Sequence, residues 1–176
     1  MGAYAVLAEA FRYPAPGRLE RLRASVAELP VGPGRTGLEA FLDAVGRSSL
    51  EAWEELCTRT LDLELATAPY VGYQIWGDKY QRSPLLSELN VAMERAGVDL
   101  DGELPDHLVP VFRYLDRSAA PVASLLGVLE PALRALEKAL AGADPENPYA
   151  HLVAGARREL KNLPAGGSAP DGRSPR

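Results

Sequence analysis

The sequence predicts an all-α protein, a single-domain bundle of about seven or eight helices with no sheet. Apolar residues recur at steps of three and four along most of the chain, and no segment alternates apolar and polar residues as a strand would. Neither a repeat nor an internal linker divides the 176 residues, of which 47% are hydrophobic. We therefore assign one helical domain to residues 1–163 and expect disorder in the tail, residues 164–176, which is rich in Gly, Pro and Ser.

Four helices are expected before residue 69. The first three apolar stripes start at Tyr4, Leu19 and Leu38, and proline or glycine ends each of them. Either Ser48 or Ser49 can cap the fourth helix, because a serine hydroxyl accepts a hydrogen bond from an unpaired N–H group of the first turn. The residues of this fourth helix that we expect to face the core are Leu50, Trp53, Leu56, Cys57, Leu61 and Leu65.

Between residues 68 and 83 the helical period lapses and aromatic residues accumulate. Tyr70, Tyr73, Trp76 and Tyr80 lie at steps of three or four among glycines. Aromatic residues with this spacing either pack into the core or line an apolar groove for a partner helix, which a nearby glycine lets approach closely. The sequence alone is compatible with both interpretations.

Three further helices complete the expected fold, besides the one that starts near residue 106. Pro84 opens one helix and Gly97 closes it. Leucines then recur in steps of four and three between residues 122 and 140, where Pro131 should kink or split the helix. Tyr149 opens the last helix.

Residues 103–108, with the sequence ELPDHL, mark the start of another helix. Pro105 disfavours a helical conformation at the preceding residue, so no helix can run through from the amino side. Asp106 is predicted to be the N-cap. His107 would then lie in the first turn, where the helix dipole favours a neutral ring that can donate and accept. Pro110 is tolerated because it also falls in the first turn.

Composition and motifs argue against several classes of function. A net charge of −5 disfavours nucleic acid as a main partner, and no apolar run is long enough to enter a membrane. Residues 1–4 lack the features of a signal peptide, and the single Cys57 favours a reducing compartment. Asp99 and Asp101 are interpreted as turn residues, because a calcium loop needs more oxygen ligands. We expect no metal and no cofactor.

The candidates for catalysis are few. His107 and His151 are the only histidines, and neither is close to Cys57 in the sequence. No nucleophile elbow, phosphate-binding loop, dinucleotide fingerprint or zinc-protease motif occurs. We therefore predict that the protein is not an enzyme, with a small helical enzyme that uses Asp106 and His107 as an alternative.

Several segments together resemble a known family. The ELPDHL stretch follows GYQIWGDKYQR at residues 72–82, and this pair resembles the nitrate-reductase-type, NarJ-like branch of the NarJ/TorD/DmsD family of molybdoenzyme maturation chaperones. Residues 7–14 are similar to the family's amino-terminal helix ending in Tyr-Pro, and residues 57–62 to its Tyr-x-x-Thr-Phe-Asp segment. Pro131 and Tyr149 also match, so that the resemblance covers residues 3–163.

The resemblance implies a cytoplasmic, non-enzymatic, all-helical chaperone without a cofactor of its own. Such a chaperone binds the N-terminal segment of the apo catalytic subunit of a molybdoenzyme, namely nitrate reductase or a related DMSO-reductase-family enzyme. It assists molybdenum cofactor insertion and complex assembly, as a monomer or dimer, without binding nucleic acid or entering the membrane. The residues expected to bind the client peptide are Tyr73, Trp76, Tyr80, Glu103, Pro105, Asp106, His107 and Tyr114. The alternative is an all-α protein-binding regulatory or scaffold module with no molybdoenzyme client.

Overall fold

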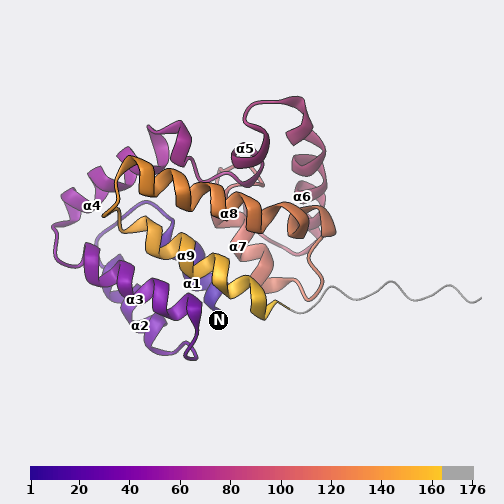
Figure 1. Ribbon diagram of the computed structural model, residues 1–176. Helices are drawn as coiled ribbons and strands as arrows, with labels where there is room; N and C mark the ends of the chain where they lie inside the picture. Colours follow the sequence, from indigo (N-terminus) through magenta and orange to yellow (C-terminus); the bar gives the residue numbers. More distant parts are fainter. Residues whose placement is uncertain (164–176) are drawn as a thin grey trace, which may run out of the picture.

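The computed structural model describes residues 1–163, and this part of the chain is built from helices (Figure 1). The α-helices are α1 (Ala3–Ala10), α2 (Arg18–Ala27), α3 (Pro33–Val45), α4 (Leu50–Cys57), α5 (Val71–Trp76), α6 (Ser83–Arg95), α7 (Leu108–Arg117), α8 (Ala123–Ala143) and α9 (Tyr149–Glu159). No strand occurs among the described residues, so the prediction of an all-α fold is confirmed. The tail for which disorder is predicted, residues 164–176, lies outside the described residues.

The helices pack around one continuous core. In Figure 1, α8 and α9 lie side by side, with α3 along the other side of α9. α1 packs against α7, and α5 packs against α8. Aromatic rings occupy the centre: the ring centroid of Tyr149 lies 5.1 Å from that of Phe41 and 6.0 Å from that of Phe11. Contacts of this kind add to the stabilisation that burial of the rings provides.

α3 and α9 approach each other closely at two glycines. A Cβ atom built on Gly37 would lie 2.8 Å from the Cα atom of Gly155 and 2.5 Å from the carbonyl oxygen of His151. Both distances are too short for a carbon atom, so only glycine at position 37 permits this packing. The contact fixes the last helix against the amino-terminal half of the chain.

The fourth helix changes form before it ends. Ser49 is its N-cap, and the hydroxyl accepts a hydrogen bond of 3.2 Å from the N–H group of Ala52, as expected for one of the two serines. After α4 the chain continues as a π-helix (Thr58–Asp62) and a 3₁₀ helix (Leu65–Thr67). Because the wider π turn alters the helical period, Leu65 is exposed, and the prediction that it faces the core is wrong.

Pro131 does not split the long C-terminal helix, since α8 runs without interruption from Ala123 to Ala143. The proline is exposed, so that its ring lies outside the core. No helix in residues 1–163 combines the length and the apolar character needed to cross a membrane. Two further 3₁₀ helices, Tyr80–Arg82 and Leu160–Asn162, complete the described secondary structure.

Candidate functional site

The two segments that the sequence singles out lie side by side in the structure. Tyr70 and His107 form an isolated antiparallel bridge. The N–H group of Val71 donates to the carbonyl oxygen of Asp106, and that of Leu108 donates to the carbonyl oxygen of Pro69, each over 2.8 Å. The rings of Tyr70 and His107 meet edge to face, with centroids 5.0 Å apart. The aromatic segment and the ELPDHL segment therefore form one unit.

Asp106 is not the N-cap of α7, so this prediction is wrong. The cap is His107, whose Nδ1 accepts a hydrogen bond of 3.1 Å from the N–H group of Val109. The helix begins one residue later than an Asp106 cap would require, because His107 itself has the extended backbone conformation of an N-cap residue. The Asp106 side chain points elsewhere and is 0% exposed.

The Asp106 carboxylate binds Arg82 and the backbone of α5. The Nε and Nη2 groups of Arg82 each donate to it over 2.8 Å, and the N–H group of Gly72 donates over 2.9 Å. These charge-assisted bonds satisfy a buried carboxylate, and the hydrogen bond to Asp106 raises the pKa of Arg82. A Cβ atom on Gly72 would lie 2.8 Å from Asp106 Oδ2, so a glycine is needed here. The role of Asp106 in this structure is to position the two segments.

The aromatic candidates are dispersed. Tyr73 and Trp76 are half-buried, and Trp76 packs against the core, whereas Tyr80 is 81% exposed. Tyr114 is buried, and its hydroxyl accepts a hydrogen bond of 3.3 Å from the N–H group of Val122, which ties the end of α7 to the start of α8. None of these four residues lines the cavity described next.

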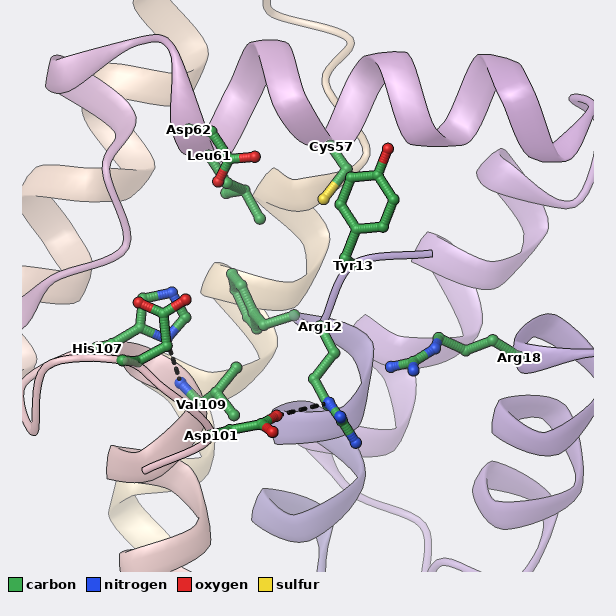
Figure 2. Close-up of a pocket in the computed structure, with 11 residues that line it drawn as sticks. Arg12, Tyr13, Arg18, Cys57, Leu61, Asp62, Asp101, His107 and Val109 are labelled. Atoms are coloured by element: carbon green, nitrogen blue, oxygen red, sulfur yellow. Dashed lines mark hydrogen bonds and ion pairs between the residues drawn. The ribbon is translucent and has the colours of Figure 1, made fainter. Parts of the chain in front are cut away.

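A cavity of about 370 Å³ lies between the amino-terminal helices, the π-helix and the start of α7 (Figure 2). Glu103 and His107 line one side of it. The rest of the lining comes from segments distant in the sequence: Phe11, Arg12, Tyr13, Arg18, Cys57, Leu61, Asp62, Asp101 and Val109. Two of the predicted site residues thus meet in this cavity, while Pro105 and Asp106 are buried beside them.

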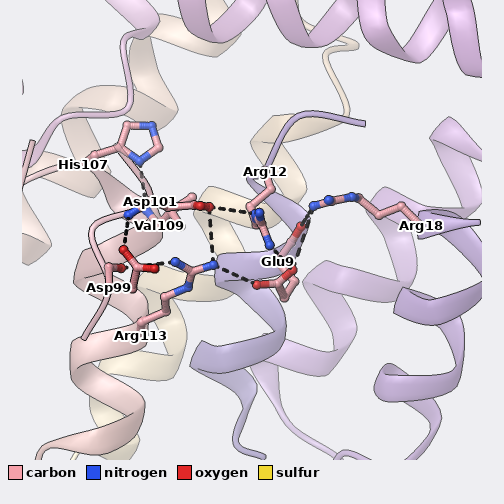
Figure 3. A network of polar contacts seen from close by, with 8 residues as sticks. All are labelled: Glu9, Arg12, Arg18, Asp99, Asp101, His107, Val109 and Arg113. Carbon is pink, nitrogen blue, oxygen red and sulfur yellow. Dashed lines mark hydrogen bonds and ion pairs between the residues drawn. The ribbon is translucent and has the colours of Figure 1, made fainter. Parts of the chain in front are cut away.

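Arginines and carboxylates in and beside the cavity form a network of ion pairs (Figure 3). Arg12 pairs with Asp101 over 3.0 Å, and Arg113 pairs with Glu9 over 3.1 Å and with Asp101 over 3.5 Å. Arg18 is less well satisfied: its Nε is buried without a hydrogen-bond partner among the described residues. Burial, together with the positive charge of Arg12, lowers the pKa of Arg18.

Two further carboxylates that line the cavity have no cation beside them in the described residues. Asp62 and Glu103 both line the cavity, and neither forms an ion pair within residues 1–163. Burial, and then the negative charge of Glu103, raises the pKa of Asp62. Glu103 accepts a hydrogen bond of 2.9 Å from the Tyr70 hydroxyl. Burial and this hydrogen bond raise the pKa of Tyr70 to about 12. Asp62 and Glu103 are therefore negative charges in the lining that no ion pair within residues 1–163 compensates.

His107 presents a hydrogen-bond donor to the cavity. The side chain is 7% exposed, and burial lowers its pKa against the opposing effect of Glu103 and Asp106. Because Nδ1 accepts from Val109, the neutral ring carries its hydrogen on Nε2. Figure 2 shows Nε2 on the side of the ring away from Val109, facing the cavity. No acceptor for Nε2 is found in the described part of the chain, so a ligand could supply one.

The chemistry of this cavity suits binding. Burial raises the pKa of the Cys57 thiol, which disfavours the thiolate that a nucleophile requires. In residues 1–163, no three or more His, Cys, Asp or Glu side chains are grouped so that they could hold a metal ion. The cavity offers apolar side chains, from Phe11, Leu61 and Val109, together with charged and hydrogen-bonding groups.

Sequence reasoning missed the amino-terminal side of this site. Arg12, Tyr13 and Arg18 carry no local pattern that links them to residues 103–108, about 90 positions further along the chain. Arg82 lies inside a segment that the sequence singles out, but its pairing with Asp106 spans 24 positions and has no periodic signature. The one sequence signal for this part of the cavity lining is the similarity of residues 7–14 and 57–62 to segments of the chaperone family.

Neither a protein-family model nor a curated protein matches the chain. A functional assignment therefore depends on the geometry of the site and on the resemblance of its segments.

Proposed function

We propose that this protein is a system-specific chaperone for a molybdoenzyme of the nitrate reductase or wider DMSO-reductase type. It binds the N-terminal segment of the apo catalytic subunit and assists molybdenum cofactor insertion and complex assembly. In this proposal the protein works in the cytoplasm, catalyses no reaction and carries no cofactor of its own.

One observation carries the proposal. The cavity is lined by residues from three segments that resemble the chaperone family, although these segments are far apart in the sequence. Phe11 and Tyr13 come from the first segment, Cys57, Leu61 and Asp62 from the second, and Glu103 and His107 from the third. A chance likeness of helical stripes gives no reason for these three separate segments to meet around one cavity.

The size and chemistry of the cavity support a peptide ligand. A volume of about 370 Å³ is enough for one or two side chains but not for a whole helix, so a bound helix would lie across the opening and insert an anchor residue. Exposed leucines follow both acidic residues in the sequence, with Leu63 after Asp62 and Leu104 after Glu103. Apolar contacts beside polar groups are the usual composition of a groove that accepts an amphipathic helix.

Co-purification tests the proposal. The full chain, carrying an affinity tag, is co-expressed with a molybdoenzyme catalytic subunit in cells that can or cannot make the molybdenum cofactor. We expect the subunit to co-purify mainly from the cells without cofactor, and removal of its N-terminal segment to abolish the interaction. If no catalytic subunit of this enzyme class co-purifies, and cofactor loading in cells does not depend on the protein, the proposal is wrong. The protein-binding regulatory module then becomes the better interpretation.

A further inference from the structure

The geometry points to a subsite within this cavity that takes a basic side chain, an arginine or a lysine, of the bound segment. Asp62 and Glu103 hold the positive charge, and His107 Nε2 donates a hydrogen bond to a carbonyl oxygen of the same segment. This inference rests on the proposed function for the identity of the segment, but the subsite can be tested without the client.

The charge distribution is the first argument. The cavity is lined by three carboxylates and two arginines, and both arginines are already paired, Arg12 with Asp101 and Arg18 with Glu9. Asp62 and Glu103 have no cation within residues 1–163, and the negative charge of Glu103 contributes to the raised pKa of Asp62. Two carboxylates that repel each other at the edge of a cavity are both stabilised when a cation enters between them.

His107 supplies a second, independent argument. It is more than nine-tenths buried, and its Nε2 faces the cavity without an acceptor in the described residues (Figure 2). A donor at the cavity surface that has no protein acceptor is free to bind a ligand, and a carbonyl oxygen is a suitable acceptor for it. An isolated cation offers no acceptor, whereas an amino-acid residue in a peptide offers both a basic side chain and a carbonyl oxygen. The two features together favour a basic residue of a peptide.

The position of Glu103 strengthens the argument. Its carboxylate is held by the Tyr70 hydroxyl over 2.9 Å, and the buried Arg82–Asp106 pair fixes the segments that carry these two residues. A carboxylate that is already oriented loses less conformational freedom when it binds a cation. Asp62 lies at the end of the π-helix and lines the same cavity as His107 (Figure 2).

Two small probes separate charge from shape. Nα-acetyl-arginine methylamide carries the guanidinium and two carbonyl groups, and Nα-acetyl-citrulline methylamide has nearly the same shape without the charge. Binding of each probe to the full chain is followed through the backbone amide resonances of Asp62, Glu103 and Val109. We expect the arginine probe to bind with a dissociation constant on the order of 1 mM, and the citrulline probe about fivefold more weakly.

Three variants locate the effect. The double variant Asp62→Asn, Glu103→Gln keeps the side-chain shapes and removes both charges. It should bind the arginine and citrulline probes with about equal affinity. Glu88→Gln with Glu94→Gln removes the same net charge from the exposed side of α6 and should leave the preference unchanged. His107→Asn keeps a capping side chain but lacks Nε2, so it should weaken both probes alike, by about threefold.

Each outcome is decisive. Equal affinity of the two probes for the wild-type chain overturns the subsite, as does a preference for arginine that survives in the Asp62→Asn, Glu103→Gln variant. Loss of the preference in the α6 variant would show a general charge effect and also overturn it. Unchanged affinities in His107→Asn would overturn the role of Nε2. If the probes show no subsite, the chaperone proposal still stands, because co-purification tests it separately. If the probes show the subsite but no molybdoenzyme subunit co-purifies, the proposed partner is wrong.

Discussion

Asp106 and Arg82 form a buried, two-bonded ion pair that joins the start of α7 to the start of α6, with each hydrogen bond 2.8 Å long. The pair holds together the segment that carries Tyr70 and the segment that carries Glu103 and His107. Since Glu103 and His107 both line the cavity, the shape of the candidate site depends on a contact that makes no part of its surface.

Asp106→Ala should lower the free energy of unfolding by about 3 kcal/mol, because it leaves Arg82, which is only 13% exposed, without its partner. A helix cap alone would cost about 0.5–2 kcal/mol. Denaturant unfolding gives the measurement. The matched control is Glu39→Gln, which breaks an exposed pair with Arg35 and should cost no more than about 0.5 kcal/mol. Equal losses in the two variants would contradict the structural role of the pair.

Gly72→Ala should destabilise the protein by about 1–3 kcal/mol, because the added methyl group collides with Asp106 and Arg82. Gly127→Ala in α8 is the control, since no atom lies within 4 Å of the position of its Cβ. It should stabilise the helix by up to about 1 kcal/mol. Thermal and denaturant unfolding of both variants measure these changes. If Gly72→Ala leaves the free energy of unfolding unchanged, Asp106 and Arg82 can move to make room for the methyl group without a loss of stability.

Protonation of His107 should destabilise the fold. Burial lowers its pKa from the ordinary value of 6.5, so the unfolded chain binds the proton more strongly. The stability that the neutral ring contributes is therefore complete above pH 6.5 and is lost as the pH falls toward the lowered pKa. We measure the free energy of unfolding of wild type and of His107→Asn from about pH 7.5 down to about pH 5. As the pH falls, wild type should lose more stability than His107→Asn.

This comparison also removes the effect of Asp62, whose raised pKa acts in the opposite direction. Asp62 binds its proton more strongly in the folded chain and favours folding as the pH falls, but it is present in both proteins. A difference that is independent of pH would mean that His107 titrates normally.

Cys57 should react slowly with iodoacetamide in the native protein, because it is buried and its thiol pKa is raised by that burial. We expect labelling at least about 100-fold slower than in denaturant, since reaction requires opening of the structure. Mass spectrometry over time measures the rate. Labelling at the rate of an exposed thiol would show that the wall of the cavity formed by α4 opens readily.

What sequence could predict was decided by distance along the chain. The apolar stripes of the first three helices, and a serine cap at residue 48 or 49, depend on neighbours within one or two turns, and the structure confirms both. The N-cap prediction for Asp106 is wrong because local sequence favours aspartate as a cap, whereas its actual partner, Arg82, lies 24 positions away. The prediction that Leu65 faces the core is wrong because no sequence pattern indicates the π-helix before it.

The candidate site shows the same division. The segments that resemble the chaperone family contain Glu103 and His107, and both reach the cavity. The aromatic residues Tyr73, Trp76 and Tyr80 were equally prominent in the sequence, yet they do not line it. Spacing along a helix indicates which residues share a face, but only the packing of distant helices determines which faces enclose a cavity.

Site-specific photo-crosslinking tests the central claim, that a client peptide binds at this cavity. A benzophenone amino acid replaces Tyr13, which lines the cavity and is 53% exposed, or Tyr80, which lies outside it. Each variant is irradiated with the apo catalytic subunit of a molybdoenzyme, and the crosslinked peptide is sequenced by mass spectrometry. The account predicts a crosslink from position 13 to the N-terminal segment of the subunit, and little or none from position 80. A crosslink from position 80 without one from position 13 would contradict it.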